Sequence, residues 1–191
     1  FSLRDFREDI LQARNWLIKF QPGNGGYPVT FTWNPSALPM GLFYLRDVVT
    51  GTIVNVDMKQ NSSFTLTNTG ITALKIEYST VPITWDATIQ LKDNGNINKD
   101  LKFGQSPMGT EGIDNALGEL PLPPAPPAGS FDARFEIPVV PTEYSYLDYR
   151  SDTSKAITWL MKFQPGGSGY PFTFTWDPLA LPEGFFFLKD N

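Results

Sequence analysis

Residues 16–47 read WLIKFQPGNGGYPVTFTWNPSALPMGLFYLRD, and residues 159–190 read WLMKFQPGGSGYPFTFTWDPLALPEGFFFLKD. The two stretches align without a gap at an offset of 143 residues, and 22 of their 32 positions are identical. A match this long indicates an internal repeat, and tandem repeats are typical of fibres, stalks and surface arrays. We therefore interpret the chain as tandem copies of a module with a period of 143 residues.

Both copies alternate apolar and polar residues with a period of two. Residues 159–163 place Trp, Met and Phe on one face, and residues 172–176 alternate aromatic residues with Thr. This pattern predicts half-buried β-strands, and residues 16–20 and 29–33 repeat it. Further strands are expected over residues 42–46, 52–58, 63–67, 74–78, 84–91, 101–103 and 131–137. Short helical turns are favoured only over residues 9–13 and 110–117.

The spacing of strands and turns indicates the fold class. The chain has 17 Pro and 16 Gly, and its predicted strands follow one another at short intervals. We expect an all-β fold of antiparallel β-sandwich, Ig-like modules in tandem. The Pro-rich segment 119–129 (ELPLPPAPPAG) is predicted to be extended, because Pro prevents helix and ladder pairing. It is either a spacer or a strand along a sheet edge, or else a ligand for an aromatic groove.

The period also suggests where the modules divide. The chain begins and ends inside the repeat, so residues 1–80 are expected to be the C-terminal part of one module. Residues 81–191 are then the N-terminal part of the next copy. Alternatively, residues 1–143 form a circularly permuted module, and residues 144–191 project from it. Open edge strands would then pair with another chain, because unpaired backbone groups template strand addition.

Composition excludes several classes of function. The net charge of −5 and the lack of a Lys/Arg cluster argue against nucleic-acid binding. No apolar run approaches the roughly 18 residues that span a bilayer. The chain has neither Cys nor His, which excludes thiol nucleophiles, Ser-His-Asp triads and the usual zinc sites. Any bound metal needs oxygen ligands, which favours Ca²⁺.

Several strings resemble a known family. LKFGQSPMGTEGIDNALGELPLPPAPPAGSFDARF, YLDYRS, WLMKFQPGGSGYPFTFTWDP and TGTIVNVDMKQNSSFTLTN are similar to a repeated β module of bacterial secreted surface proteins. Those proteins are exported by the type IX secretion system. The resemblance implies extracellular or cell-surface placement, a β-sandwich and a structural or adhesive role. It supplies no catalytic residues.

Two acidic segments are candidate metal sites. Asp93, Asn96, Asn98 and Asp100 surround a Gly, as in a calcium-binding loop, although their spacing is not that of an EF-hand. An Asn/Gly-rich hairpin turn needs the same residue types. The second segment carries Glu111, Asp114 and Glu119, of which Asp114 is our further candidate calcium ligand. Local turn hydrogen bonding is the alternative there, and glycoside hydrolysis by paired carboxylates is the catalytic one.

The aromatic residues suggest a binding surface. Most Trp residues are expected in the core, because they alternate with polar residues in strands. Tyr27 and Tyr170 lie in Gly-Tyr-Pro turns and are the candidates for exposed contacts, for example with glycans. The sequence 148–150 (Asp-Tyr-Arg) matches 5–7 (Asp-Phe-Arg), and in each the Asp and Arg on one strand face are expected to form a structural ion pair or a cross-strand contact.

We therefore expect a non-catalytic structural or adhesive repeat of an extracellular fibre or cell-surface protein. Its partners would be copies of itself or its tandem neighbours, joined by strand exchange into a filament. The alternative is a carbohydrate-binding module of a secreted glycan-degrading enzyme. An enzyme in its own right is the least favoured class.

Overall fold

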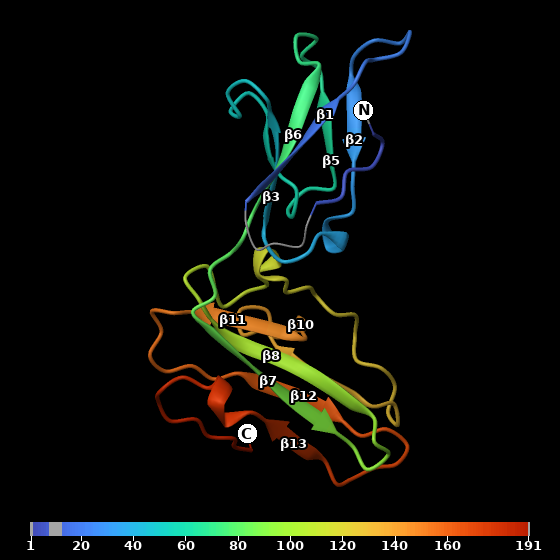
Figure 1. Cartoon of the computed structure of the whole chain (residues 1–191). Coiled ribbons are helices and arrows are strands. Elements are labelled where there is room, and N and C mark those ends of the chain that lie inside the picture. The colour runs from blue at the N-terminus through green and yellow to red at the C-terminus, as the bar shows by residue number, and fades with distance from the viewer. Residues whose placement is uncertain (1, 8–12, 191) are drawn as a thin grey trace. The chain divides into compact units, whose positions relative to one another are not determined.

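The computed structural model describes residues 2–7 and 13–190, and these form an all-β protein with several antiparallel sheets (Figure 1). The chain divides into two compact units. Unit 1 contains the described residues up to Val81 together with Asn115–Gly118. Unit 2 contains Pro82–Asp114 and the described residues from Glu119 onward.

Unit 1 is built from two sheets whose inner side chains share one core. The larger sheet has the order β1-β6-β3-β4, and β2 pairs with β5 in a two-stranded ribbon. The core contains Phe43, Leu45, Leu66 and Leu74, and Phe31 packs against it. The strands are β1 (Arg14–Lys19), β2 (Val29–Thr32), β3 (Leu42–Asp47), β4 (Asn55–Asp57), β5 (Ser63–Leu66) and β6 (Ala73–Ser79), and the 3₁₀ helices are η1 (Pro35–Ala37) and η2 (Asn115–Leu117).

Unit 2 follows the same plan with other strands. One sheet has the order β11-β8-β7-β13 and the other the order β10-β9-β12. Leu91, Leu101, Ala133 and Phe135 form the core that they share. The β11–β8 pair is parallel, an exception to the antiparallel expectation. The elements are β7 (Trp85–Lys92), β8 (Asn98–Ser106), β9 (Asp132–Glu136), β10 (Tyr144–Ser145), β11 (Leu147–Ser151), β12 (Leu160–Gln164), β13 (Thr173–Trp176) and the 3₁₀ helix η3 (Pro178–Ala180).

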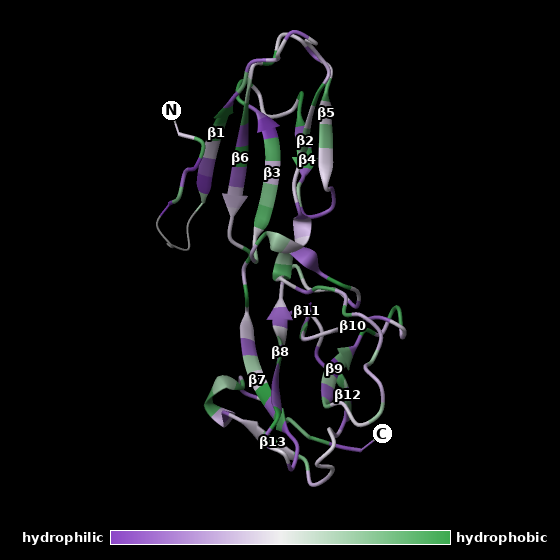
Figure 2. Cartoon of the chain, turned by 90° about the vertical axis from the view of Figure 1, so that its right-hand side faces the viewer, coloured by the Kyte–Doolittle hydropathy of each residue, from purple (hydrophilic) through white to green (hydrophobic). Residues whose placement is uncertain are grey.

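The predicted alternation is visible along the strands, where apolar and polar residues succeed one another (Figure 2). In β3 every second residue is buried. The predicted strand 52–58 is shorter in the structure, because residues 48–54 form a loop around the Asp47 carboxylate. That carboxylate accepts N–H bonds from Val49, Thr50, Ile53 and Val54. The predicted strand 101–103 extends over all of β8.

The two helical turns expected from the sequence have different outcomes. Of residues 110–117, only Asn115–Leu117 is helical, as η2. The turn expected over 9–13 falls almost entirely on residues 8–12, which lie outside the described residues.

The turns and 3₁₀ helices of copy one (residues 16–47) and copy two (residues 159–190) adopt the same local conformations. Asn34 and Asp177 cap η1 and η3 in the same way, each accepting a backbone N–H two residues ahead. Gly26 and Gly169 both have positive φ, at 65° and 69°, and the Tyr-Pro peptide that follows each is cis. The counterpart of β3 in copy two, residues 185–190, forms no strand.

Candidate functional site

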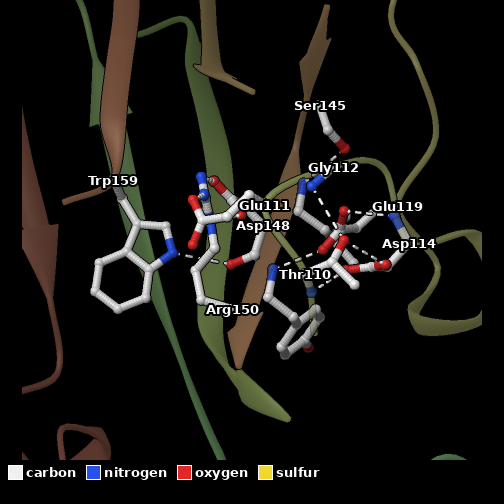
Figure 3. Close-up of polar contacts among 11 residues, drawn as sticks. Thr110, Glu111, Gly112, Asp114, Glu119, Ser145, Asp148, Arg150 and Trp159 are labelled. Atoms are coloured by element: carbon white, nitrogen blue, oxygen red, sulfur yellow. Dashed lines mark hydrogen bonds and ion pairs between the residues drawn. The ribbon is translucent and has the colours of Figure 1, made fainter. Parts of the chain in front are cut away.

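The densest polar cluster surrounds Arg150 on β11 (Figure 3). Asp148 and Arg150 are two residues apart in a strand, so both project from the same face. The Arg150 Nε and Nη2 groups donate to the two Asp148 carboxylate oxygens, and Nη1 donates to Glu111. The Arg150 side chain is completely buried. The ion pair expected from the sequence is therefore present, but inside unit 2 rather than on its surface.

Glu119 organises the other half of this cluster. Its Oε1 atom accepts the Tyr149 N–H at 2.6 Å, and its Oε2 atom accepts the Asp114 N–H at 2.9 Å. Asp114 in turn accepts the N–H and the hydroxyl of Thr110. Burial raises the pKa of Glu119 to about 8, against the two N–H donors that lower it. Burial also raises the pKa of Asp114 and that of Asp148.

The hydrogen bonds of this cluster stabilise unit 2 by holding separate segments of the chain together. Trp159 of copy two donates its indole N–H to the Asp148 carbonyl at 3.1 Å, so the cluster joins β11 to the repeat. Gly109 lies against the Arg150 backbone, and a Cβ at residue 109 would be 2.5 Å from the Arg150 carbonyl carbon. Asp148 and Glu119 are fully buried, and each accepts hydrogen bonds within the cluster. The hydrogen bonds and ion pairs of the cluster hold the 107–119 loop on β11.

The first calcium candidate is the β7–β8 hairpin. Asp93 is buried, and its carboxylate accepts the N–H groups of Gly95, Ile97 and Gly166. Asn96 has a positive φ of 63°, which suits the hairpin turn.

The other calcium candidates lie elsewhere. Asn98 is exposed in β8, Asp100 accepts a hydrogen bond from Gln90, and Asp114 belongs to the Arg150 cluster. Among residues 2–7 and 13–190, no group of three or more Asp, Glu, His or Cys residues is placed to hold a metal. Calcium binding stays a prediction.

The Pro-rich segment 119–129 is held on unit 2 by side-chain donors. Arg134 donates to the Pro123 carbonyl at 2.7 Å, while Asp132 fixes the same guanidinium. Gln164 of copy two donates to the carbonyls of Pro126, Pro127 and Ser130. Sequence reasoning missed these anchors, although 132–134 repeats the Asp-x-Arg spacing of 148–150.

The two candidate tyrosines differ in exposure. Tyr27 packs on the core of unit 1 and donates its hydroxyl to the Ile71 carbonyl at 2.5 Å. Tyr170, its counterpart in copy two, is 68% exposed. Tyr170 is thus exposed and Tyr27 is partly buried, and binding by either residue stays a prediction.

Tyr170 belongs to a larger apolar surface that sequence reasoning did not find. Five residues of copy two are exposed, although their counterparts in copy one pack in or against the core of unit 1. We call them the open face of copy two: Phe163, Tyr170, Trp176, Phe186 and Leu188, which correspond to Phe20, Tyr27, Trp33, Phe43 and Leu45. Isolated exposed apolar residues are normal, and a set of this kind is a candidate interaction surface.

No family model, curated protein or solved structure matches this chain. In the part of the chain that the structure describes, no helix has the length and apolar character needed to cross a membrane.

Proposed function

We propose that the chain is a non-catalytic structural repeat of an extracellular or cell-surface assembly, and that it associates through β-strands with neighbouring copies of itself. The observation that carries this proposal is the open face of copy two. The same residue types pack in or against the core of unit 1 and are exposed in unit 2, so copy two carries core-type residues that nothing in unit 2 covers.

The free strand edges of copy two also support an assembly role. Strands β12 and β13 lie at the ends of their sheet orders, so each presents one edge to an incoming strand. Strand addition supplies main-chain hydrogen bonds, and the apolar side chains on alternate positions supply specificity. Ig-like tandem modules joined in this way form the fibre or adhesive surface that the family resemblance implies.

Electron microscopy of the purified chain, together with sedimentation over a range of concentrations, tests this role. We expect filaments or higher oligomers, and we expect Leu188→Asp to abolish them, since it places a charge on the open face. Leu179→Asp is the matched control, because Leu179 is exposed in copy two outside the open face and its counterpart Ser36 is exposed as well. Monodisperse monomers at every concentration would contradict self-association.

A carbohydrate-binding role is the second candidate. The exposed Phe185 and Phe187 rings are stacked, with centroids 6.5 Å apart and planes 11° apart, and aromatic faces of this kind stack on sugar rings. Saturable retention on a polysaccharide that is lost in Phe185→Ala/Phe187→Ala would support this role. Equal retention of both forms would argue against it.

A further inference from the structure

The repeated segment pairs with different strands in the two units. In unit 1, β1 pairs with β6, and β2 pairs with β5. In unit 2 the corresponding strands β12 and β13 pair with β9 and β7 instead. One sequence therefore accepts two sets of partners, one from residues 48–81 and the other from residues 82–143.

The two sets of partners occupy opposite edges of the first repeated strand. In an antiparallel ladder, alternate residues direct their N–H and C=O groups to opposite neighbours. Phe20 N–H donates to the Thr72 carbonyl, so Phe20, Ile18 and Trp16 face β6. In unit 2, Ile137 N–H donates to Glu143, so the odd-numbered residues of β9 face β10.

The even-numbered residues of β9 consequently face β12, where they pair with Leu160, Lys162 and Gln164. Leu160 and Gln164 correspond to Leu17 and Gln21 of copy one, which alternate with the residues that face β6. Partners equivalent to β9 and to β6 can thus bind one strand at the same time.

The second repeated strand follows the same rule. Trp33 N–H donates to the Ser62 carbonyl, so Trp33 and Phe31 face β5. Asp93 N–H donates to Ile97, so Leu91 faces β8, while Lys92 and Gln90 face β13. These two residues pair with Thr173 and Thr175, the counterparts of Thr30 and Thr32. The edges used by β5 and by β7 are again opposite.

Two glycines of the repeat fit partners that only their own unit supplies. Gly41 must lack a side chain, because a Cβ would lie 2.2 Å from the Tyr78 ring, whereas a Cβ on its counterpart Gly184 would meet only the Phe186 ring, at 3.8 Å. Conversely, a Cβ on Gly166 would meet Asp93 at 2.9 Å, and nothing lies within 4 Å of that position on Gly23.

The residues just before the two copies also differ in the partners that surround them. Tyr149 is buried in unit 2 between β8 and the Arg150 cluster, while its counterpart Phe6 in unit 1 is 88% exposed. Asp5 and Arg7, the counterparts of the buried Asp148 and Arg150, form a half-exposed pair. Unit 1 therefore lacks partners that residues 82–143 supply in unit 2.

From these relationships we infer that the open face of copy two is the binding site for a second copy of residues 48–81, placed after Asp190 as residues 48–81 follow Asp47.

The complete module is then a two-sheet sandwich. One sheet runs β10-β9-β12 and continues with the counterparts of β6, β3 and β4. The other runs β11-β8-β7-β13 and continues with the counterpart of β5. Residues 185–190 form the counterpart of β3. This inference rests on the proposed strand-pairing role and names its partner.

An extended chain tests the inference, with residues 48–81 placed directly after Asp190. We expect unit 2 to unfold at a higher denaturant concentration, and tryptophan emission to shift to shorter wavelength as Trp176 is covered. The control extension carries Asp in place of both Leu66 and Leu74 in the appended copy only, and it should behave like the original chain.

Two substitutions in copy two make the test specific. Leu188→Asp and the milder Tyr170→Phe should leave the unfolding midpoint of unit 2 unchanged in the original chain. In the extended chain Leu188→Asp should lower the folded-to-unfolded ratio of unit 2 by about 30-fold or more, and Tyr170→Phe should lower it less. Equal midpoints for the extended chain and its control, or neutral substitutions in both chains, would overturn the inference. A stabilised extended chain that never forms filaments would support the completed module and contradict only the assembly role.

Discussion

Leu45 and Leu188 occupy the same position of the repeat, yet Leu45 is 2% exposed and Leu188 is 53% exposed. Leu45 lies in β3, between β6 and β4, and packs in the core of unit 1. Leu188 belongs to a segment without strand partners in unit 2. The difference arises from the strands that surround each copy, because the local sequences are nearly the same.

This pair gives the first prediction. Leu45→Ala should destabilise unit 1 by about 2–5 kcal/mol, because it removes buried methyl groups and leaves a cavity. Leu188→Ala, its matched control, should leave the unfolding of unit 2 nearly unchanged. Denaturant titration of both variants measures the two effects. Similar losses in the two variants would show that Leu188 is also buried.

The second prediction concerns Arg150. Arg150→Ala should destabilise unit 2 by about 3–5 kcal/mol, since it leaves the buried Asp148 carboxylate without its cation. Arg150→Lys should recover only part of this loss, because an ammonium lacks the bidentate geometry. Arg7→Ala removes the half-exposed counterpart and should change little. A mild effect of Arg150→Ala in urea unfolding would contradict the stabilising role of the Arg150 cluster.

The third prediction is a pH dependence of unit 2. The pKa of Glu119 is raised by burial from 4.5 to about 8, so the folded state holds a proton that the unfolded state releases. Its stabilising effect is complete below about pH 4.5 and is lost as the pH rises toward 8. Urea midpoints of unit 2 should therefore fall across this range. Glu119→Gln should flatten the slope, and an unchanged slope would exclude Glu119 as its source.

The fourth prediction is an acid sensitivity of unit 1. The backbone N–H of Thr50 and the other donors hold the pKa of Asp47 far below its ordinary value of 3.8. The stability that the carboxylate contributes is present above that ordinary value and is lost as the pH falls below it. In the Asp47→Asn variant, unit 1 should lose less stability than in the parent chain between pH 5 and pH 2 (roughly the range in which carboxylates protonate). Asp190→Asn in the exposed counterpart should match the parent chain, and equal acid sensitivity in all three chains would argue against this role of Asp47.

The fifth prediction concerns calcium. If the 93–100 hairpin binds Ca²⁺ as its sequence suggests, millimolar CaCl₂ should raise the melting temperature of unit 2, and EGTA should reverse the change. Asp93→Ala cannot separate calcium binding from hairpin folding, since its carboxylate already accepts three N–H groups. Asp100→Asn is the better variant, because Asp100 is on the surface of β8. No response to calcium in the parent chain would contradict the calcium hypothesis.

The sequence predicted the strands well where alternation is strict. The alternation in 16–20, 29–33 and 172–176 appears as β1, β2 and β13, because an apolar residue of each strand packs against a core. It predicted β4 too long, because the Asp47 carboxylate holds the backbone of residues 48–54 as a loop. Such a loop depends on one side chain and has no periodic signal.

The candidate sites were harder to predict. The Asp148 and Arg150 ion pair was expected from spacing, but its complete burial depends on Glu111 and Glu119, which come from a distant loop. The open face of copy two has no sequence signal, because copy one carries the same five residues packed in or against the core of unit 1. Only the partners supplied by the fold distinguish the two copies.

Amide hydrogen exchange of β12 in the original and extended chains tests the completed module most directly. Leu160 and Lys162 direct their N–H groups toward β9 and should exchange slowly in both chains. Met161 and Phe163 direct theirs to the opposite edge, so they should exchange quickly in the original chain and slowly in the extended chain. Unchanged exchange at Met161 and Phe163 after the extension would contradict the claim that residues 48–81 complete the repeat.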